Sequence, residues 1–404
     1  MSLPKNIFGA RAAILGGLAI LTAPFLWTRL DPDFATGFVS LRLVPENGIQ
    51  FLSVVVPAAL VALAIAGLGR LWARYGSSKP LFETASHRLF ESPRAMAATF
   101  AALAAAGFVM RGKALSLGTF VCIHMMLAIG LNVTIGFTGL LVLGYAAFYA
   151  TGAYTFAIAA HALPVLPTWA ALPLGFTVAA GVGFLVGLPC LRLRGDYLAI
   201  VTLGFAEALR EILRNLSVTG GDMGLVVPMQ ARIKAIGPVG QGHASWIAAV
   251  GVTLLVALFV HRLYHSRIGR AWIAIREDET AAAMMGIPVV RLKLLAFTVS
   301  AGLAGTAGAF FAGFAGFVDP STATFEQSVL ILAMVILGGI GSLPGSILGA
   351  ALLYLAPTLL RDWFPAISDY RLFFFGCILV AMMLFRPQGL CGSPRHKLEL
   401  EGAS

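Results

Sequence analysis

The chain has 404 residues, of which 59% are hydrophobic and only 11% are charged. A soluble globular domain has about 25% charged residues, so this composition excludes one. The mean hydropathy is +0.88. Apolar runs of roughly 20 residues, long enough to cross about 30 Å of hydrocarbon, recur along the chain. The sequence therefore predicts an all-α fold, a polytopic helical membrane protein with about 10–12 transmembrane segments.

The formal net charge of +10 has two explanations, a nucleic-acid partner or the positive-inside rule of membrane proteins. The basic residues lie in short loops and near the ends of the chain, which favours the positive-inside rule and no nucleic acid. Alternation of the spans then predicts cytoplasmic N- and C-termini. It also predicts a cytoplasmic segment His265–Lys293 and an external position for Asp319 and Glu326.

The apolar stretches predict about twelve spans in chain order. Several are short, so broken or re-entrant helices are expected among them. The basic loop Ala73–Arg94 separates an accessory part, residues 1–94, from a core, residues 95–390, which is followed by a cytoplasmic tail, residues 391–404. The predicted spans are Gly9–Thr28, Phe51–Trp72, Ala95–Met110, Leu117–Ile135, Leu140–Ala160, Trp169–Pro189, Tyr197–Leu213, Ser245–Tyr264, Leu294–Phe314, Ser328–Ile340, Ser346–Leu360 and Leu372–Phe385.

The segment Gly130–Tyr154 combines glycines with small polar residues inside an apolar stretch. Glycines on helix faces let neighbouring backbones approach closely. The polar side chains among them either line a polar path through the membrane or pack with satisfied hydrogen bonds. The candidate path residues are Asn132, Thr134, Gly136, Thr138 and Gly139.

The segment Leu191–Leu225 carries four ionisable residues at helical spacing, Glu207, Arg210, Glu211 and Arg214. Such residues at membrane depth are costly and indicate function. The alternative is that the helix ends near Ala206 and the four charges lie in the external headgroup region. The run Thr219–Asp222 predicts a turn.

Glycines and a proline in Leu337–Ala350 predict a helix break in the bilayer or at its cytoplasmic edge. The run is not a phosphate loop, because no Gly-Lys-Ser/Thr element opens a helix. The four cysteines lack metal-ligand spacing, and the chain contains no His-Glu-x-x-His, dinucleotide or nucleophile-elbow motif. We therefore expect no metal, no cofactor and no enzymatic activity.

The segment His265–Lys293 is a dense polar island between two apolar stretches. Its composition predicts one helix from about Arg270 to Met285, capped by Gly286 and stopped by Pro288. Ala271, Ile275, Ala282 and Met285 would form an apolar knob with a charged rim at Arg276–Glu279. Such a helix fits a groove on another protein. The alternative is a helix lying on lipid, which the three acidic residues disfavour.

Four stretches, Gly130–Tyr154, Leu191–Asn215, Ser266–Phe310 and Leu337–Ala350, resemble the membrane permease subunits of ABC importers for branched-chain amino acids. The resemblance is to the larger of the two permease types and covers about residues 95–390. ABC importer permeases carry a cytoplasmic Glu-Ala-Ala-x-x-x-Gly loop that contacts the ATPase. Ala281, Ala282 and Gly286 match its register, Thr280 takes the Glu position, and no Ile-x-Leu-Pro follows. The implied coupling loop comprises Arg270, Arg276, Glu277, Asp278, Glu279, Ala281, Ala282 and Gly286.

The resemblance implies a transport subunit in the lipid of a bacterial inner membrane. It implies a heterodimer with a second permease subunit, two cytoplasmic ATP-binding subunits and a periplasmic amino-acid-binding protein. The alternative is an ion-coupled secondary amino-acid transporter, which needs an ion site near the midplane. Glu207 and Glu211 are the only acids within a predicted span, and they lie near its end.

Overall fold

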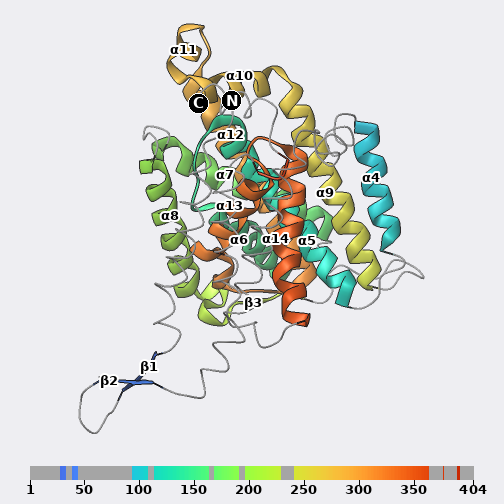
Figure 1. The fold of residues 1–404 in the computed structure, drawn as a ribbon, viewed down its shortest axis with the longest axis vertical. Helices are drawn as coiled ribbons and strands as arrows, with labels where there is room; N and C mark the ends of the chain where they lie inside the picture. Colours follow the sequence, from blue (N-terminus) through green and yellow to red (C-terminus); the bar gives the residue numbers. More distant parts are fainter. Residues whose placement is uncertain are drawn as a thin grey trace, which may run out of the picture. The chain divides into compact units, whose positions relative to one another are not determined.

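The computed structural model describes residues 28–32, 39–43, 93–107, 113–162, 168–190, 196–228, 241–363, 376 and 389–391 (Figure 1). The predicted spans Gly9–Thr28, Phe51–Trp72 and Leu372–Phe385 lie outside these residues, apart from Thr28 and Gly376. The chain divides into two compact units, residues 1–80 with 360–387, and residues 81–359 with 388–404. In the first unit, β1 (Thr28–Pro32) pairs antiparallel with β2 (Val39–Leu43).

The second unit contains the helices that correspond to the predicted spans from Ala95 to Leu360. Each of these spans coincides with one helix, so the predicted helical architecture is confirmed. The elements are α4 (Pro93–Ala106), α5 (Lys113–Asn132), η1 (Val133–Phe137), α6 (Tyr145–Ala162), α7 (Thr168–Cys190), α8 (Asp196–Asn215), η2 (Ser217–Thr219), η3 (Gly221–Met223), β3 (Leu225–Val226), α9 (Gln241–His265), α10 (Arg267–Glu277), α11 (Glu279–Met284), α12 (Val289–Ala315), β4 (Phe317–Val318), η4 (Pro320–Ala323), α13 (Phe325–Gly338) and α14 (Leu343–Trp363).

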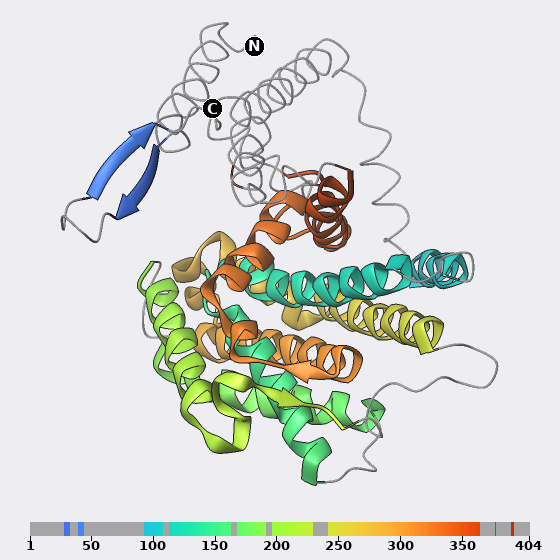
Figure 2. The same cartoon turned by 90° about the horizontal axis from the view of Figure 1, so that it is seen from below.

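Four helical stretches in the described residues are long and apolar enough to cross a membrane, and they are Lys113–Phe137, Trp169–Pro189, Gly242–His265 and Val289–Ala315. Two shorter apolar helices, Phe325–Gly338 and Leu343–Leu355, lie on either side of the predicted glycine break. The chain is therefore a multi-pass helical membrane protein. Figure 2 shows α4 beside α9 at the edge of this bundle.

The helix α12 packs against α6 and α7 through glycines. A Cβ at Gly305 of α12 would clash with the Gly175 carbonyl of α7, and a Cβ at Gly152 of α6 would clash with the Gly305 carbonyl. Because hydrophobic burial does not drive helices together within lipid, close van der Waals contact at small residues becomes the main attraction. These glycines therefore hold the centre of the bundle together.

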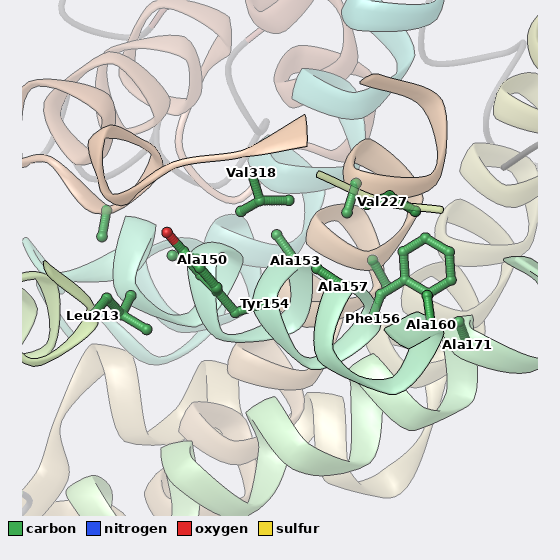
Figure 3. Packing of buried hydrophobic residues seen from close by; sticks show 13 residues of the cluster. Ala150, Ala153, Tyr154, Phe156, Ala157, Ala160, Ala171, Leu213, Val227 and Val318 are labelled. Carbon is green, nitrogen blue, oxygen red and sulfur yellow. The ribbon is translucent and has the colours of Figure 1, made fainter. Parts of the chain in front are cut away.

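One end of the bundle is closed by a short two-stranded sheet. Leu225 of β3 pairs with Val318 of β4, directly after the end of α12. Val318 and Val227 are fully buried against the alanine-rich face of α6, including Ala153 and Ala157 (Figure 3). This sheet, which sequence patterning did not predict, fixes α12 to α6 at the end remote from α10 and α11.

The ionisable residues of α8 lie on a helix that continues to Asn215, so a helix end near Ala206 is wrong. Arg210 donates from Nη1 to Glu207 at 2.9 Å. Arg214 pairs through Nε with Asp222 at 2.6 Å. The Gly220 φ of +78° and the Gly221 φ of +59° confirm the predicted turn at Thr219–Asp222. The paired charges therefore belong to the end of the bundle that carries β3 and β4.

Replacement of Gly305 by valine should expel α12 from its contacts with α6 and α7. Overpacking of this kind typically costs about 1–3 kcal/mol, so we expect aggregation or a clearly lower unfolding temperature of the detergent-solubilised protein. Gly181→Val on α7 is the matched control, because nothing lies within 4 Å of a Cβ at that position. Equal thermal stability of the two variants would contradict this packing.

Candidate functional site

The polar island begins with a sharp turn between α9 and α10. Ser266 caps α10, and its hydroxyl accepts a hydrogen bond from the Gly269 N–H at 3.3 Å. Gly269 has no room for a side chain, because a Cβ there would clash with the Tyr264 carbonyl. Arg270 donates from Nη1 to the His265 carbonyl at 3.1 Å, which places this predicted site residue in the turn itself.

Trp272 anchors α10 to the membrane helices. Its side chain is fully buried, and its indole Nε1–H donates to the Leu292 carbonyl in the first turn of α12 at 2.8 Å. A buried tryptophan with its N–H satisfied combines a large packing contribution with a fixed orientation. The hydrogen bond therefore joins α10 directly to the start of α12.

The predicted single helix from Arg270 to Met285 is wrong, because the chain breaks at Asp278. The Asp278 backbone is extended, with φ −153° and ψ 113°, and its side chain caps α11. Its Oδ1 accepts hydrogen bonds from the N–H of Thr280 at 2.8 Å and of Ala281 at 3.0 Å. A hydrogen bond from the Thr280 hydroxyl, together with these two backbone bonds, holds the pKa of the Asp278 carboxyl below its usual value.

Gly286 ends α11 as predicted. Its φ is +80°, a left-handed conformation that favours glycine. The Gly286 N–H donates to the Ala283 carbonyl and the Ile287 N–H donates to the Ala282 carbonyl, which together form a Schellman cap. Pro288 then precedes the first residue of α12. Both ends of the short helix α11 are therefore fixed by local bonds.

An ion pair joins α11 to α12. Lys293 Nζ lies 2.6 Å from Glu279 Oε2, and the lysine side chain is only 12% exposed. Such a partly buried pair is screened less than a surface one. Glu277 is exposed at the end of α10. Of the three predicted acidic residues, Asp278 and Glu279 therefore have structural partners, whereas Glu277 faces outward.

The predicted apolar knob has a different composition in the structure. Ile275 and Ala282 are buried, 3% and 5% exposed, and pack inward. Met284 and Met285 instead project outward, 88% and 83% exposed. The break at Asp278 changes the direction of the chain, so the faces of α10 and α11 are not continuous. Two adjacent methionines at the end of α11 are therefore the most exposed large apolar side chains of the segment, ahead of Val290 at 63%.

Arg276 connects the polar island to the Gly130–Tyr154 segment. Its Nη1 donates to the Gly136 carbonyl at 2.6 Å, in the π-helical turn that ends α5. Beside this contact, the Gly341 N–H donates to Asn132 Oδ1 at 2.9 Å. Residues from three separate sequence motifs, namely the island, the glycine-rich helix and the glycine break, therefore meet at one point.

The remaining candidate path residues lie close to this point. Thr134 and Thr138 are buried, and their hydroxyls donate to the carbonyls of Leu131 and Thr134 at 3.0 and 2.7 Å. Gly139 is exposed, with a φ of +72°. These hydrogen bonds satisfy both threonine hydroxyls within the bundle, as expected if the residues serve helix packing rather than a polar path. The translocation role of these residues stays a prediction.

Sequence reasoning did not single out Trp272, Met284 or Lys293. Asp278 followed by Glu279 is a recognisable helix start, since both residue types favour helix N-termini, and it could have revealed the break. The Arg276–Gly136 contact had no sequence signal, because the two residues are 140 positions apart.

Comparison with known proteins shows the family of the chain. The family model described as a branched-chain amino acid transport system permease component matches residues 113–383. The chain belongs to this permease family. The LivM high-affinity branched-chain amino acid permease proteins of Salmonella typhimurium and of Escherichia coli K12 are each 40% identical to it. They align over 73% and 74% of this permease and the same shares of their own chains.

The family also includes a second type of permease subunit. The LivH permease protein of Salmonella typhimurium is 24% identical over 67% of this chain and 92% of its own length. No solved structure matches the chain. The higher identity to LivM than to LivH confirms that this permease is of the larger, LivM type. Its relatives are permeases, which indicates a transport subunit.

Replacement of Asp278 by alanine should unwind the start of α11, because the cap bonds to Thr280 and Ala281 disappear. We expect faster hydrogen–deuterium exchange in the segment Asp278–Gly286 at neutral pH. Asp278→Asn is the matched control and should keep slow exchange, since asparagine is an equally good cap. The lowered pKa of Asp278 means that the charged cap is complete at neutral pH. The contribution of the charged cap to the stability of α11 is lost only as the pH falls through that lowered pKa.

Proposed function

We propose that this permease forms one half of the translocation pathway of an ATP-driven importer for branched-chain or related hydrophobic amino acids. Its partners would be a second, smaller permease, two cytoplasmic ATP-binding subunits and a periplasmic amino-acid-binding protein, in the bacterial inner membrane. The relatives named LivM and LivH, both described as permease proteins of branched-chain amino acid transport systems, support a pair of permeases. The positive-inside rule supports cytoplasmic N- and C-termini.

The observation that carries the proposal is the exposed methionine pair at the tip of α11. Met284 and Met285 project from a six-residue helix that is capped at Asp278 and at Gly286. Methionine side chains are flexible and polarizable and are used at protein-binding surfaces. A short helix that presents an apolar tip suits a groove on a partner protein. We infer that this tip docks into a groove of an ATP-binding subunit.

The mechanism follows from the anchors of α10 and α11. Closure of the ATP-binding subunits would displace the docked tip. The displacement would reach α12 through the Trp272–Leu292 hydrogen bond and the Lys293–Glu279 ion pair. The glycine contacts of α12 with α6 and α7 would spread the movement through the bundle. Specificity would come largely from the binding protein, so this subunit needs no elaborate amino-acid site.

The competing function is an ion-coupled secondary transporter. That class uses a carboxylate buried near the midplane to bind its coupling ion. Where the structure describes burial, the buried polar side chains include no Asp or Glu. The two glutamates of α8 are exposed, Glu207 by 45% and Glu211 by 66% of their side chains. This distribution favours the ATP-driven importer.

Reconstitution into proteoliposomes tests the function directly. The permease, the second permease and the ATP-binding subunits would be reconstituted, with a binding protein from the same organism outside. We expect uptake of leucine, isoleucine and valine that requires ATP inside the vesicles. Uptake that follows an imposed proton or sodium gradient without ATP would favour the secondary transporter.

Replacement of both Met284 and Met285 by aspartate should abolish co-purification of the ATP-binding subunits, because two charges would enter an apolar groove. Met223→Asp is a matched control. Met223 is also 88% exposed but lies beyond the far end of α12, a helix of 27 residues and so about 40 Å long. Normal co-purification of the double variant would contradict docking at this tip.

A further inference from the structure

We propose that Arg276 is the positioning residue that transmits movement of α10 and α11 to the interrupted membrane helices α5, α13 and α14. This inference rests on the proposed function, because it assumes that a partner moves α10 and α11. The Arg276 contact would transmit this movement to α5, α13 and α14, in addition to the route through α12 described above.

The Arg276 bond has the geometry of a strong contact. Its Nη1 lies 2.6 Å from the Gly136 carbonyl, within the distance expected for a charged donor. Gly136 lies in the last turn of the continuous helix Lys113–Phe137, whose C-terminal carbonyls carry partial negative charge. A guanidinium at this end is therefore favoured by the helix dipole as well as by the hydrogen bond.

The Gly136 carbonyl lies in a π-helical turn. Such turns occur mostly singly within α-helices and are frequent at functional sites. Gly136 is also required sterically. A Cβ there would clash with Asn132 Oδ1 and would lie 2.8 Å from the Gly341 N–H nitrogen. The absence of a side chain therefore allows the Asn132–Gly341 hydrogen bond to form against the turn that Arg276 holds.

The other partner is the break between α13 and α14. Gly341 has a φ of +81°, and a Cβ there would lie 3.0 Å from Arg276 Nη1. The same break is held from another side by residues near the C-terminus. The N–H groups of Leu390 and Cys391 donate to the Leu337 and Gly338 carbonyls at 2.8 and 2.9 Å. Arg276 therefore reaches a junction where helix ends, rather than helix middles, are in contact.

The Arg276 contact differs mechanically from the two bonds that join α10 and α11 to α12, namely Trp272–Leu292 and Glu279–Lys293. Trp272 of α10 and Glu279 of α11 bind Leu292 and Lys293 near the start of α12, a continuous helix that would move as a rigid rod. Arg276 binds the π-helical turn that follows α5 and lies beside the α13–α14 break, and helices bend at such interruptions. Pulling on Arg276 would therefore bend α5 and shift the α13–α14 break relative to α12. We assign to this contact the opening and closing of the permease at its cytoplasmic end.

The test compares two replacements of similar length in the full reconstituted complex, Arg276→Met, which lacks a donor, and Arg276→Lys, which keeps one. For Arg276→Met we expect normal co-purification of the ATP-binding subunits and continued ATP hydrolysis. Loss of the charged hydrogen bond should lower leucine uptake per ATP hydrolysed by roughly tenfold. Arg276→Lys should stay within about threefold of the unmodified protein, because one donor suffices. Arg262→Met, at an exposed arginine in the last turn of α9, is the control for loss of charge.

Two results would overturn the inference. One is an Arg276→Met complex with unchanged uptake per ATP. The other is loss of the ATP-binding subunits, which would make Arg276 a docking residue. If Arg276→Met is not recovered from membranes, Asn132→Ala is tested instead, because it removes the Asn132–Gly341 hydrogen bond of the same junction. Normal leucine uptake per ATP hydrolysed in that variant would contradict the proposal. Failure of the proposed function is distinct, because the unmodified complex would then show no ATP-dependent uptake.

Discussion

The close backbone packing of α12 against α6 and α7 is the constraint on which the rest of the bundle depends. A Cβ at Gly152 or Gly305 would clash with a neighbouring backbone, so only glycine at these positions allows the helices to approach this closely. Within a bilayer such contacts replace the hydrophobic driving force that assembles soluble proteins. They make α12 a fixed central rod to which both ends of the bundle attach.

The two ends of α12 are attached in different ways. At one end, β4 follows α12 directly and pairs with β3, which closes the bundle over the alanines of α6. At the other end, the Leu292 carbonyl and the Lys293 ammonium hold α10 and α11. The first attachment is apolar packing plus a short sheet, whereas the second combines the buried Trp272 with individual polar bonds. Polar bonds that depend on single side chains can be remade in another geometry more readily than a packed core.

The segment of α10 and α11 combines rigidity with an exposed tip. Caps at Asp278 and Gly286 order a helix of six residues, which would be too short to persist alone. The buried Trp272 and Ile275 turn the apolar face of α10 inward. Met284 and Met285, the most exposed large apolar side chains of this segment, are left for a partner. An ordered tip loses little conformational entropy on binding, which suits a contact that must transmit force rather than adapt to its partner.

The sequence by itself determined the helical membrane class, the helices from α4 to α14 except for the division into α10 and α11, the glycine break before α14 and the Gly286 cap. These features depend on hydrophobic length and on local backbone preferences, which are readable over short distances. The tertiary structure decided which side chains face outward after the break at Asp278. It also decided that Arg276 meets Gly136 and that Asn132 meets Gly341, residues separated by 140 and 209 positions. Such pairings depend on how helices cross in space, and no local pattern of apolar or charged residues specifies that crossing.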